Sequence, residues 1–365
     1  MLFRSAELNR AWGTELADWT AAADVTEDHK VRDITGRFFD YDDYLSELFA
    51  ELVKAGVAEV NRALPDTPVG VQTMGGYALS PREAVFLHRF VKHETLVLTP
   101  TGGGRWTAGG SASRPPASRL VSPIAPAPLE NELLLALSGD KMIFDNETYL
   151  QGQTRREIRN RLWSHVLCGL DGLTIFSWSK RGWAWWGDRQ KVQIEADKYP
   201  YSNLNPIARR TDGLRGILEF AGEIQEVAGD VLPKGWGPTP TVGLLYSWPQ
   251  ARRLVLDATT PDKTAAYYAA LKYGHANLRV VPSDRALTPE GLAGLRVLVL
   301  GGVRHLEPEL VPVLAGFVRD GGVLVFGEAV PGLDIYGHPL PALPTAGEFG
   351  EADTTPAPCG DLKLR

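Results

Sequence analysis

Short apolar runs alternate with amphipathic stretches along most of the chain, and this alternation limits the fold more than any other feature of the sequence. In the first 235 residues, four runs have the length and apolar content of buried strands: residues 68–74, 95–100, 142–147 and 172–178. Strands that alternate with helices in series are typical of parallel α/β sheets covered by helices. The sequence therefore predicts an α/β fold with four strand–helix units in this part of the chain.

Helical stretches separate these runs. Residues 41–64 place apolar side chains at helical spacing, which predicts a long amphipathic helix. Ser80 suits the N-cap of a helix over residues 81–91, which begins with a proline. Two more helices are expected, over residues 129–137 and 153–170.

A stretch rich in proline and glycine, residues 232–240, predicts a boundary between two modules. After it, four apolar runs are expected to be strands: residues 241–246, 278–281, 297–300 and 323–326. Helices are expected near residues 263–273 and 308–319. This order predicts a flavodoxin-like or glutamine-amidotransferase-like sheet.

The second module lacks the nucleophile that an amidotransferase needs. That enzyme class carries a cysteine on a tight turn after a strand, and the corresponding turn here reads Gly301-Gly302-Val303. We therefore expect a structural or oligomerisation module. The predicted organisation is residues 1–235, residues 236–330 and a Pro/Gly-rich tail over residues 331–365.

The pentapeptide Asp145-Asn146-Glu147-Thr148-Tyr149 closes the apolar run of residues 142–144. Barrels of parallel strands keep their catalytic groups at the carboxyl ends of the strands, so Glu147 is a candidate catalytic carboxylate. A tryptophan cluster follows the next expected strand: Trp178, Trp183, Trp185 and Trp186. Sugars bind where flat aromatic surface lies beside a few carboxylates, so these residues together predict a carbohydrate site.

The candidate sugar-contacting residues come from the same two strand ends and from one earlier aromatic residue: Asn146, Tyr149, Trp178, Trp183 and Trp19. For Tyr149 and Trp178 a role as ordinary core aromatics remains an alternative.

Composition excludes several classes of function. The net charge is −6, and no basic cluster is present, which argues against nucleic acid as a partner. No apolar run reaches the roughly 18 residues that span a bilayer, so no membrane partner and a cytoplasmic location are expected. The two cysteines cannot form a four-cysteine zinc site, and His88 and His93 lack the spacing of a helical zinc pair. Neither a metal nor a cofactor is predicted.

The segment Leu8-Asn9-Arg10-Ala11-Trp12-Gly13-Thr14 resembles one found in glycoside hydrolase family 42 β-galactosidases. Glu147, the strand end Phe176-Ser177-Trp178 and a second module similar to that family's trimerisation domain follow in the family's order. The resemblance implies a (β/α)8 barrel, retaining hydrolysis of β-galactosides, a trimer and a nucleophilic role for Glu147. A second carboxylic acid would protonate the leaving oxygen.

Counted back from Glu147, the four expected units correspond to the last four of a barrel's eight strands. The family's acid/base glutamate would therefore lie before Met1, and we expect this chain to be the C-terminal part of a longer enzyme. A role for Glu147 as the acid/base is the alternative, but the order of the motifs argues against it. The segment after Trp178 lacks the family's galactose-binding pattern, so the identity of the sugar substrate is not determined by the sequence. A catalytically inactive half-barrel that serves in sugar binding or assembly is the competing interpretation.

Overall fold

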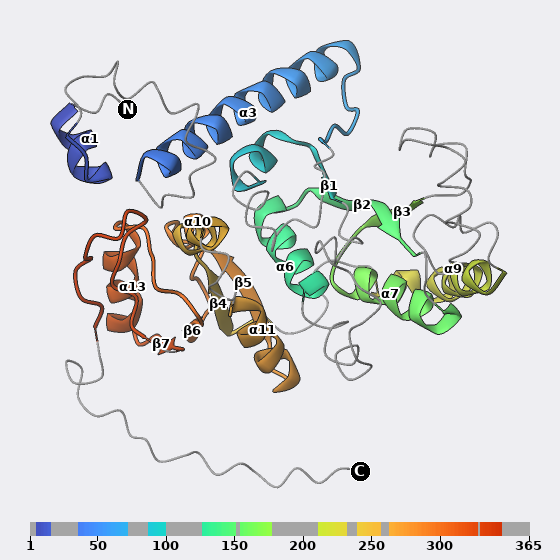
Figure 1. Cartoon of the computed structure of the whole chain (residues 1–365). Helices are drawn as coiled ribbons and strands as arrows, with labels where there is room; N and C mark the ends of the chain where they lie inside the picture. Colours follow the sequence, from blue (N-terminus) through green and yellow to red (C-terminus); the bar gives the residue numbers. More distant parts are fainter. Residues whose placement is uncertain are drawn as a thin grey trace, which may run out of the picture.

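The computed structural model describes residues 5–15, 36–71, 87–99, 126–150, 154–176, 211–231, 239–256, 263–327 and 329–344. Within these ranges the chain forms two parallel sheets, each accompanied by helices (Figure 1). The part before residue 235 contains α1 (Ser5–Trp12), α3 (Gly36–Ala63), η2 (Val91–His93), β1 (Leu96–Thr99), α6 (Pro126–Ser138), β2 (Met142–Tyr149), α7 (Arg155–Leu167), β3 (Gly172–Phe176) and α9 (Thr211–Val231). The α/β class is confirmed. None of the described helices is long and apolar enough to cross a membrane.

The first sheet has the order β1-β2-β3, with β2 in the centre and all described pairs parallel. Helix α6 connects β1 to β2, and its leucines form a core with Val97 and Ile143, both of which are fully buried. Helix α7 connects β2 to β3. Three of the four expected strands thus form a parallel sheet among the described residues, in keeping with the partial barrel that the family resemblance implies.

Helix α9 packs along α7 and was not expected from the sequence. Ile158 and Leu162 of α7 form a small apolar cluster with Phe220 of α9. Glu223 of α9 accepts hydrogen bonds from the Trp163 indole and from Arg159, at 2.7 Å and 2.8 Å. The two helices thus form one layer outside β2 and β3 (Figure 1).

The prediction of a strand over residues 68–74 is wrong for residues 68–71, which form no strand. Residues 72–74 lie outside the described ranges. Side-chain oxygens accept hydrogen bonds from the backbone N–H groups that a strand ladder would use. The Val69 N–H donates to Thr95 Oγ1 at 2.7 Å, and the Val71 N–H donates to Glu94 Oε1 at 2.7 Å. Side-chain acceptors of this kind compete with strand pairing, so the segment runs beside β1 without joining the ladder.

The second sheet has the order β5-β4-β6-β7, which is the flavodoxin-like arrangement. Its elements are β4 (Val242–Tyr246), α10 (Trp248–Leu256), α11 (Thr264–Tyr273), β5 (Leu278–Pro282), α12 (Ser283–Ala286), β6 (Val297–Leu300), α13 (Leu310–Arg319) and β7 (Val323–Phe326). All four strands were predicted, whereas α10 and α12 were not. From residue 331 to residue 344 the chain stays on this module, because Leu333 pairs with His305 and Leu343 is buried in its core.

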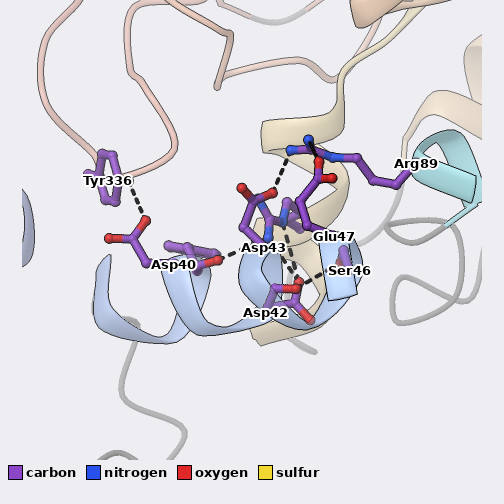
Figure 2. Close-up of polar contacts among 9 residues, drawn as sticks. Asp40, Asp42, Asp43, Ser46, Glu47, Arg89 and Tyr336 are labelled. Carbon is purple, nitrogen blue, oxygen red and sulfur yellow. Dashed lines mark hydrogen bonds and ion pairs between the residues drawn. The ribbon is translucent and has the colours of Figure 1, made fainter. Parts of the chain in front are cut away.

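Acidic residues at the start of α3 join the two modules (Figure 2). The Arg252 guanidinium of α10 donates to Asp42 Oδ2 at 3.1 Å and to the Phe39 carbonyl at 3.0 Å. The Tyr336 hydroxyl donates to Asp40 Oδ1 at 2.6 Å, and Trp12 donates to the other oxygen of Asp40. This acidic start of α3 is therefore the polar centre of the contact between the modules.

A second contact joins α6 to the other module. The Tyr268 hydroxyl donates to Glu132 Oε1 at 2.8 Å, and Lys272 forms an ion pair with the same carboxylate. Arg285 Nη2 donates to the Leu137 carbonyl at 3.0 Å. Two separate sets of bonds thus hold the second sheet against the partial barrel.

Candidate functional site

The pentapeptide that contains Glu147 forms the carboxyl-terminal half of β2, the central strand of the first sheet. The pairing of β2 with β3 shifts within it, because Asp145 pairs with Leu173 whereas Thr148 pairs with Ile175. Asn146 and Glu147 therefore lie opposite a single residue, Thr174, which is the geometry of a β-bulge. Bulges are frequent beside active sites, where they change the direction of a side chain.

The bulge is held by hydrogen bonding on its β3 side. The Thr174 hydroxyl donates to the Asn146 carbonyl at 2.6 Å. This bond fixes the backbone next to Glu147 without a regular ladder. The sequence motif and the irregularity of the strand therefore coincide.

Asp145 faces the helical layer. It shares the helix-facing side of β2 with Ile143, and its carboxylate is fully buried 3.4 Å from Nδ1 of His165 on α7. Burial, with a smaller effect of Arg161, lowers the pKa of His165 to about 3, so that the imidazole is neutral at pH 7. Asp145 thus positions β2 against α7, and it is not part of an open site.

Two buried oxygens flank Glu147 in the sequence. Asn146 Oδ1 and Thr148 Oγ1 have no hydrogen-bond partner among the described residues. Buried polar atoms are nearly always paired, and those at functional sites often pair with a ligand or with solvent. The bulge therefore carries hydrogen-bonding capacity that the described part of the chain does not use.

Most of the predicted sugar-contacting side chains lie outside the described part of the structure. The backbones of Glu147 and Tyr149 belong to β2, but their side chains are not described. Trp19, Trp178 and Trp183 lie in ranges that are not described. The roles predicted for these residues, and for Asn146 as a sugar contact, stay predictions.

The segment Leu8–Thr14 forms most of α1 and the turn that ends it. Gly13 has a positive φ of 66°, and Thr14 donates to Asn9 through both its backbone N–H and its hydroxyl, each at 2.9 Å. The half-buried Trp12 donates to Asp40 at 2.7 Å. The segment that carries the sequence resemblance therefore has a structural role at the module contact.

Glu94 is a buried carboxyl group that the sequence analysis did not single out. Burial raises its pKa to about 8, although its hydrogen bond from Val71 and the nearby Lys141 act in the opposite direction. A perturbed pKa often marks a functional site. Glu94, however, lies two residues before the start of β1, at the amino ends of the strands, where barrels do not place their chemistry.

The described ranges contain no group of three or more side chains suited to hold a metal ion. The ring of His88 stacks on Trp248, with centroids 4.2 Å apart. Cys168 is a free thiol whose pKa is raised to about 11, mainly by burial.

No protein-family model matches the sequence, and no curated protein matches it either. Solved structures are similar in fold. One is a family 42 exo-carrageenase from Bacteroides ovatus, with a TM-score of 0.70 and 13% identity, over 94% of this chain and 46% of the other. The β-galactosidase of Rahnella sp. R3 has a TM-score of 0.67 and 13% identity, over 92% and 48%. The β-galactosidase of Halorubrum lacusprofundi has a TM-score of 0.63 and 16% identity, over 92% and 49%.

The fold resembles part of a family 42 glycoside hydrolase. The match extends over both modules of this chain, and the chain spans about half the length of the structures that it matches. The likeness confirms the fold expected from Leu8–Thr14 and the order of the later motifs. At these identities it establishes the fold alone.

Proposed function

We propose that this chain carries the nucleophile of a retaining β-glycosidase that acts on β-linked galactosides, and that Glu147 is that nucleophile. The observation that carries the proposal is the position of Glu147 in a bulge at the carboxyl end of the central strand β2. Barrel enzymes keep their catalytic groups at this end of the strands. The fold likeness to β-galactosidases and to an exo-carrageenase supports the choice of substrate class.

In this mechanism a carboxylate oxygen of Glu147 attacks the anomeric carbon, and an ester to the sugar forms as the bond to the leaving oxygen breaks. Water then hydrolyses the ester, which restores the carboxylate and retains the configuration of the sugar. In retaining enzymes a second carboxylic acid about 5–5.5 Å away protonates the leaving oxygen. We assign no residue of this chain to that second role.

The nucleophile can be tested separately from the acid. A 2,4-dinitrophenyl 2-deoxy-2-fluoro-β-galactoside has a leaving group that departs without protonation, and its fluorine slows hydrolysis of the ester. We expect intact-protein mass spectrometry to show one added fluorogalactosyl group, and peptide mapping to place it on Glu147. The Glu147→Gln variant should not be labelled.

The matched control is Asp140→Asn, which removes an exposed acidic group before the other end of β2 and should be labelled like the wild type. Labelling at another residue, or labelling that persists in Glu147→Gln, would show that Glu147 is not the nucleophile.

Sugar binding without turnover is the second candidate function. It is favoured by the length of the chain, which is about half that of the matched enzymes. In that case the trapping reagent leaves the protein unlabelled, while isothermal titration calorimetry detects galactose binding. We propose Asn146, Tyr149, Trp178, Trp183 and Trp19 as the contacts, and expect Trp178→Ala to weaken binding about tenfold or more. Unchanged affinity in the Trp178 and Trp183 variants would place the sugar elsewhere.

A further inference from the structure

Thr174 is the residue of β3 that lies opposite the two bulge residues of β2. Its neighbours Leu173 and Ile175 both pack against the apolar cluster of α7 and α9. Successive side chains of a strand point to opposite sides of the sheet. Thr174 therefore lies on the side of the sheet away from these helices, where its side chain is exposed.

The bulge decides where Glu147 falls in the alternation of β2. Ile143 packs on the leucines of α6, and Asp145 lies against α7, so both are on the helix-facing side. In a strand without a bulge, the period of two residues would put Glu147 on that same side. The extra residue between Asp145 and Thr148 interrupts this series. The placement of Glu147 therefore depends on the bulge being held.

The Thr174 hydroxyl bonds to the peptide group that joins the two bulge residues. It donates to the Asn146 carbonyl oxygen at 2.6 Å, an ordinary length for a bond between two oxygens. A peptide group is planar and ends at the Cα atom of the next residue, which here is Glu147. A donor that fixes this oxygen therefore fixes the plane that contains the Glu147 Cα atom.

We propose that Thr174 is a positioning residue for Glu147, whose hydroxyl holds the bulge in the conformation from which the carboxylate attacks the anomeric carbon. This role rests on the proposed function, in which Glu147 is the nucleophile. A misplacement of about 1 Å at a reacting group can slow a reaction about a hundredfold. The hydroxyl proton is already donated to Asn146, which separates this role from a bond donated to the sugar.

The test compares Thr174→Val with Thr174→Ser in the full chain. Valine has nearly the shape of threonine and suits a strand but cannot donate, whereas serine keeps the hydroxyl. Thr174 is exposed, so neither substitution opens a cavity in the core. The matched control is Thr288→Val, which removes an exposed threonine hydroxyl that donates to the Arg285 carbonyl at 3.0 Å in the other module.

The measurement is the rate at which the 2,4-dinitrophenyl 2-deoxy-2-fluoro-β-galactoside labels Glu147, followed over a range of reagent concentrations. Thr174→Val should lower the limiting rate constant about tenfold or more and change the half-saturating concentration by less than about twofold. Thr174→Ser should keep the rate constant within about threefold of the wild type, because the donor remains. Thr288→Val should match the wild type. All four proteins should reach one label per chain.

The outcomes separate this role from the proposed function. A wild type that is not labelled at Glu147 overturns both. Labelling of the wild type at Glu147, with an unchanged rate constant in Thr174→Val, overturns the positioning role alone.

Three further results for the variants would overturn the positioning role. A lower final amount of label at an unchanged rate constant indicates loss of folded protein. A higher half-saturating concentration at an unchanged rate constant indicates a direct contact between Thr174 and the sugar. A Thr174→Ser variant as slow as Thr174→Val shows that the hydroxyl is not the group that acts.

Discussion

At the scale of single residues, the carboxyl groups near the first sheet have different environments and therefore different roles. Glu94 lies at the amino end of β1 and is buried, whereas Asp145 lies in β2 beside the neutral His165. The buried Glu94 carboxyl destabilises the fold when it is ionised, whereas Asp145 helps to position β2 against α7. Glu147 lies in the bulge at the carboxyl end of β2, which is why we assign the chemistry to it.

Glu94→Gln tests the energetic cost of the buried acid. The folded pKa is about 8, above the ordinary 4.5, so the stability linked to the protonated acid is present below about pH 4.5 and is lost as pH rises through 8. Relative to the wild type, we expect Glu94→Gln to gain free energy of unfolding between pH 5 and 8, by about 1 kcal/mol per pH unit. Urea denaturation at several pH values measures this gain.

Gln retains the acceptor for the Val71 N–H, so the substitution removes the ionisable proton and keeps the hydrogen bond. The control is Glu290→Gln on an exposed loop, whose stability should follow that of the wild type at every pH. A difference for Glu94→Gln that does not vary with pH would contradict the assignment.

At the scale of elements, α7 connects the candidate strand to the rest of the partial barrel. It begins with a capping box, in which Thr154 Oγ1 accepts from the Glu157 N–H at 3.4 Å and Glu157 Oε2 accepts from the Thr154 N–H at 2.7 Å. Its other end holds His165 against Asp145. The position of β2 therefore depends on an intact α7.

Thr154→Ala should lower the free energy of unfolding by about 1 kcal/mol, because it removes the capping oxygen. Thermal and urea denaturation provide the measurement. Thr154→Ser retains the hydroxyl and should cost clearly less than the alanine variant. Equal losses in the two variants would show that the cap does not stabilise α7.

The elements that the sequence predicted best are those whose signal is local. Buried parallel strands such as β4 and β6 appear as uninterrupted apolar runs, so their positions needed no knowledge of their neighbours. The bulge at Asn146 and Glu147 depends on pairing with β3, and the burial of Asp145 depends on a histidine 20 residues later. Residues 68–71 failed as a strand because side chains of residues 94 and 95 compete for their N–H groups.

At the scale of the whole molecule, Arg252 of α10 is one of the polar links between the two modules, through its bonds to Asp42 and Phe39 of α3. Its side chain is only 11% exposed, and burial raises the pKa of its partner Asp42. Removing one member of this largely buried ion pair leaves the other charge poorly compensated. The relative placement of the modules therefore depends in part on this guanidinium group, beside the bonds that Tyr268 and Arg285 make to α6.

Arg252→Ala should lower the free energy of unfolding by about 3 kcal/mol and make calorimetric unfolding less cooperative. Adding Asp42→Asn should restore part of the loss, because the uncompensated charge is then absent. The exposed Arg304→Ala is the control and should change stability by less than about 0.5 kcal/mol. A loss that the second substitution does not reduce would contradict a role for the charge pair.

The bulge in β2 also makes the site sensitive to the length of the chain. Between the pairs Asp145–Leu173 and Thr148–Ile175, β2 has two residues where β3 has one. Deleting one of them would produce an uninterrupted ladder, in which the residues after the deletion take the opposite faces of the strand. Glu147 owes its place as much to an unequal count of residues in two neighbouring strands as to its own chemistry.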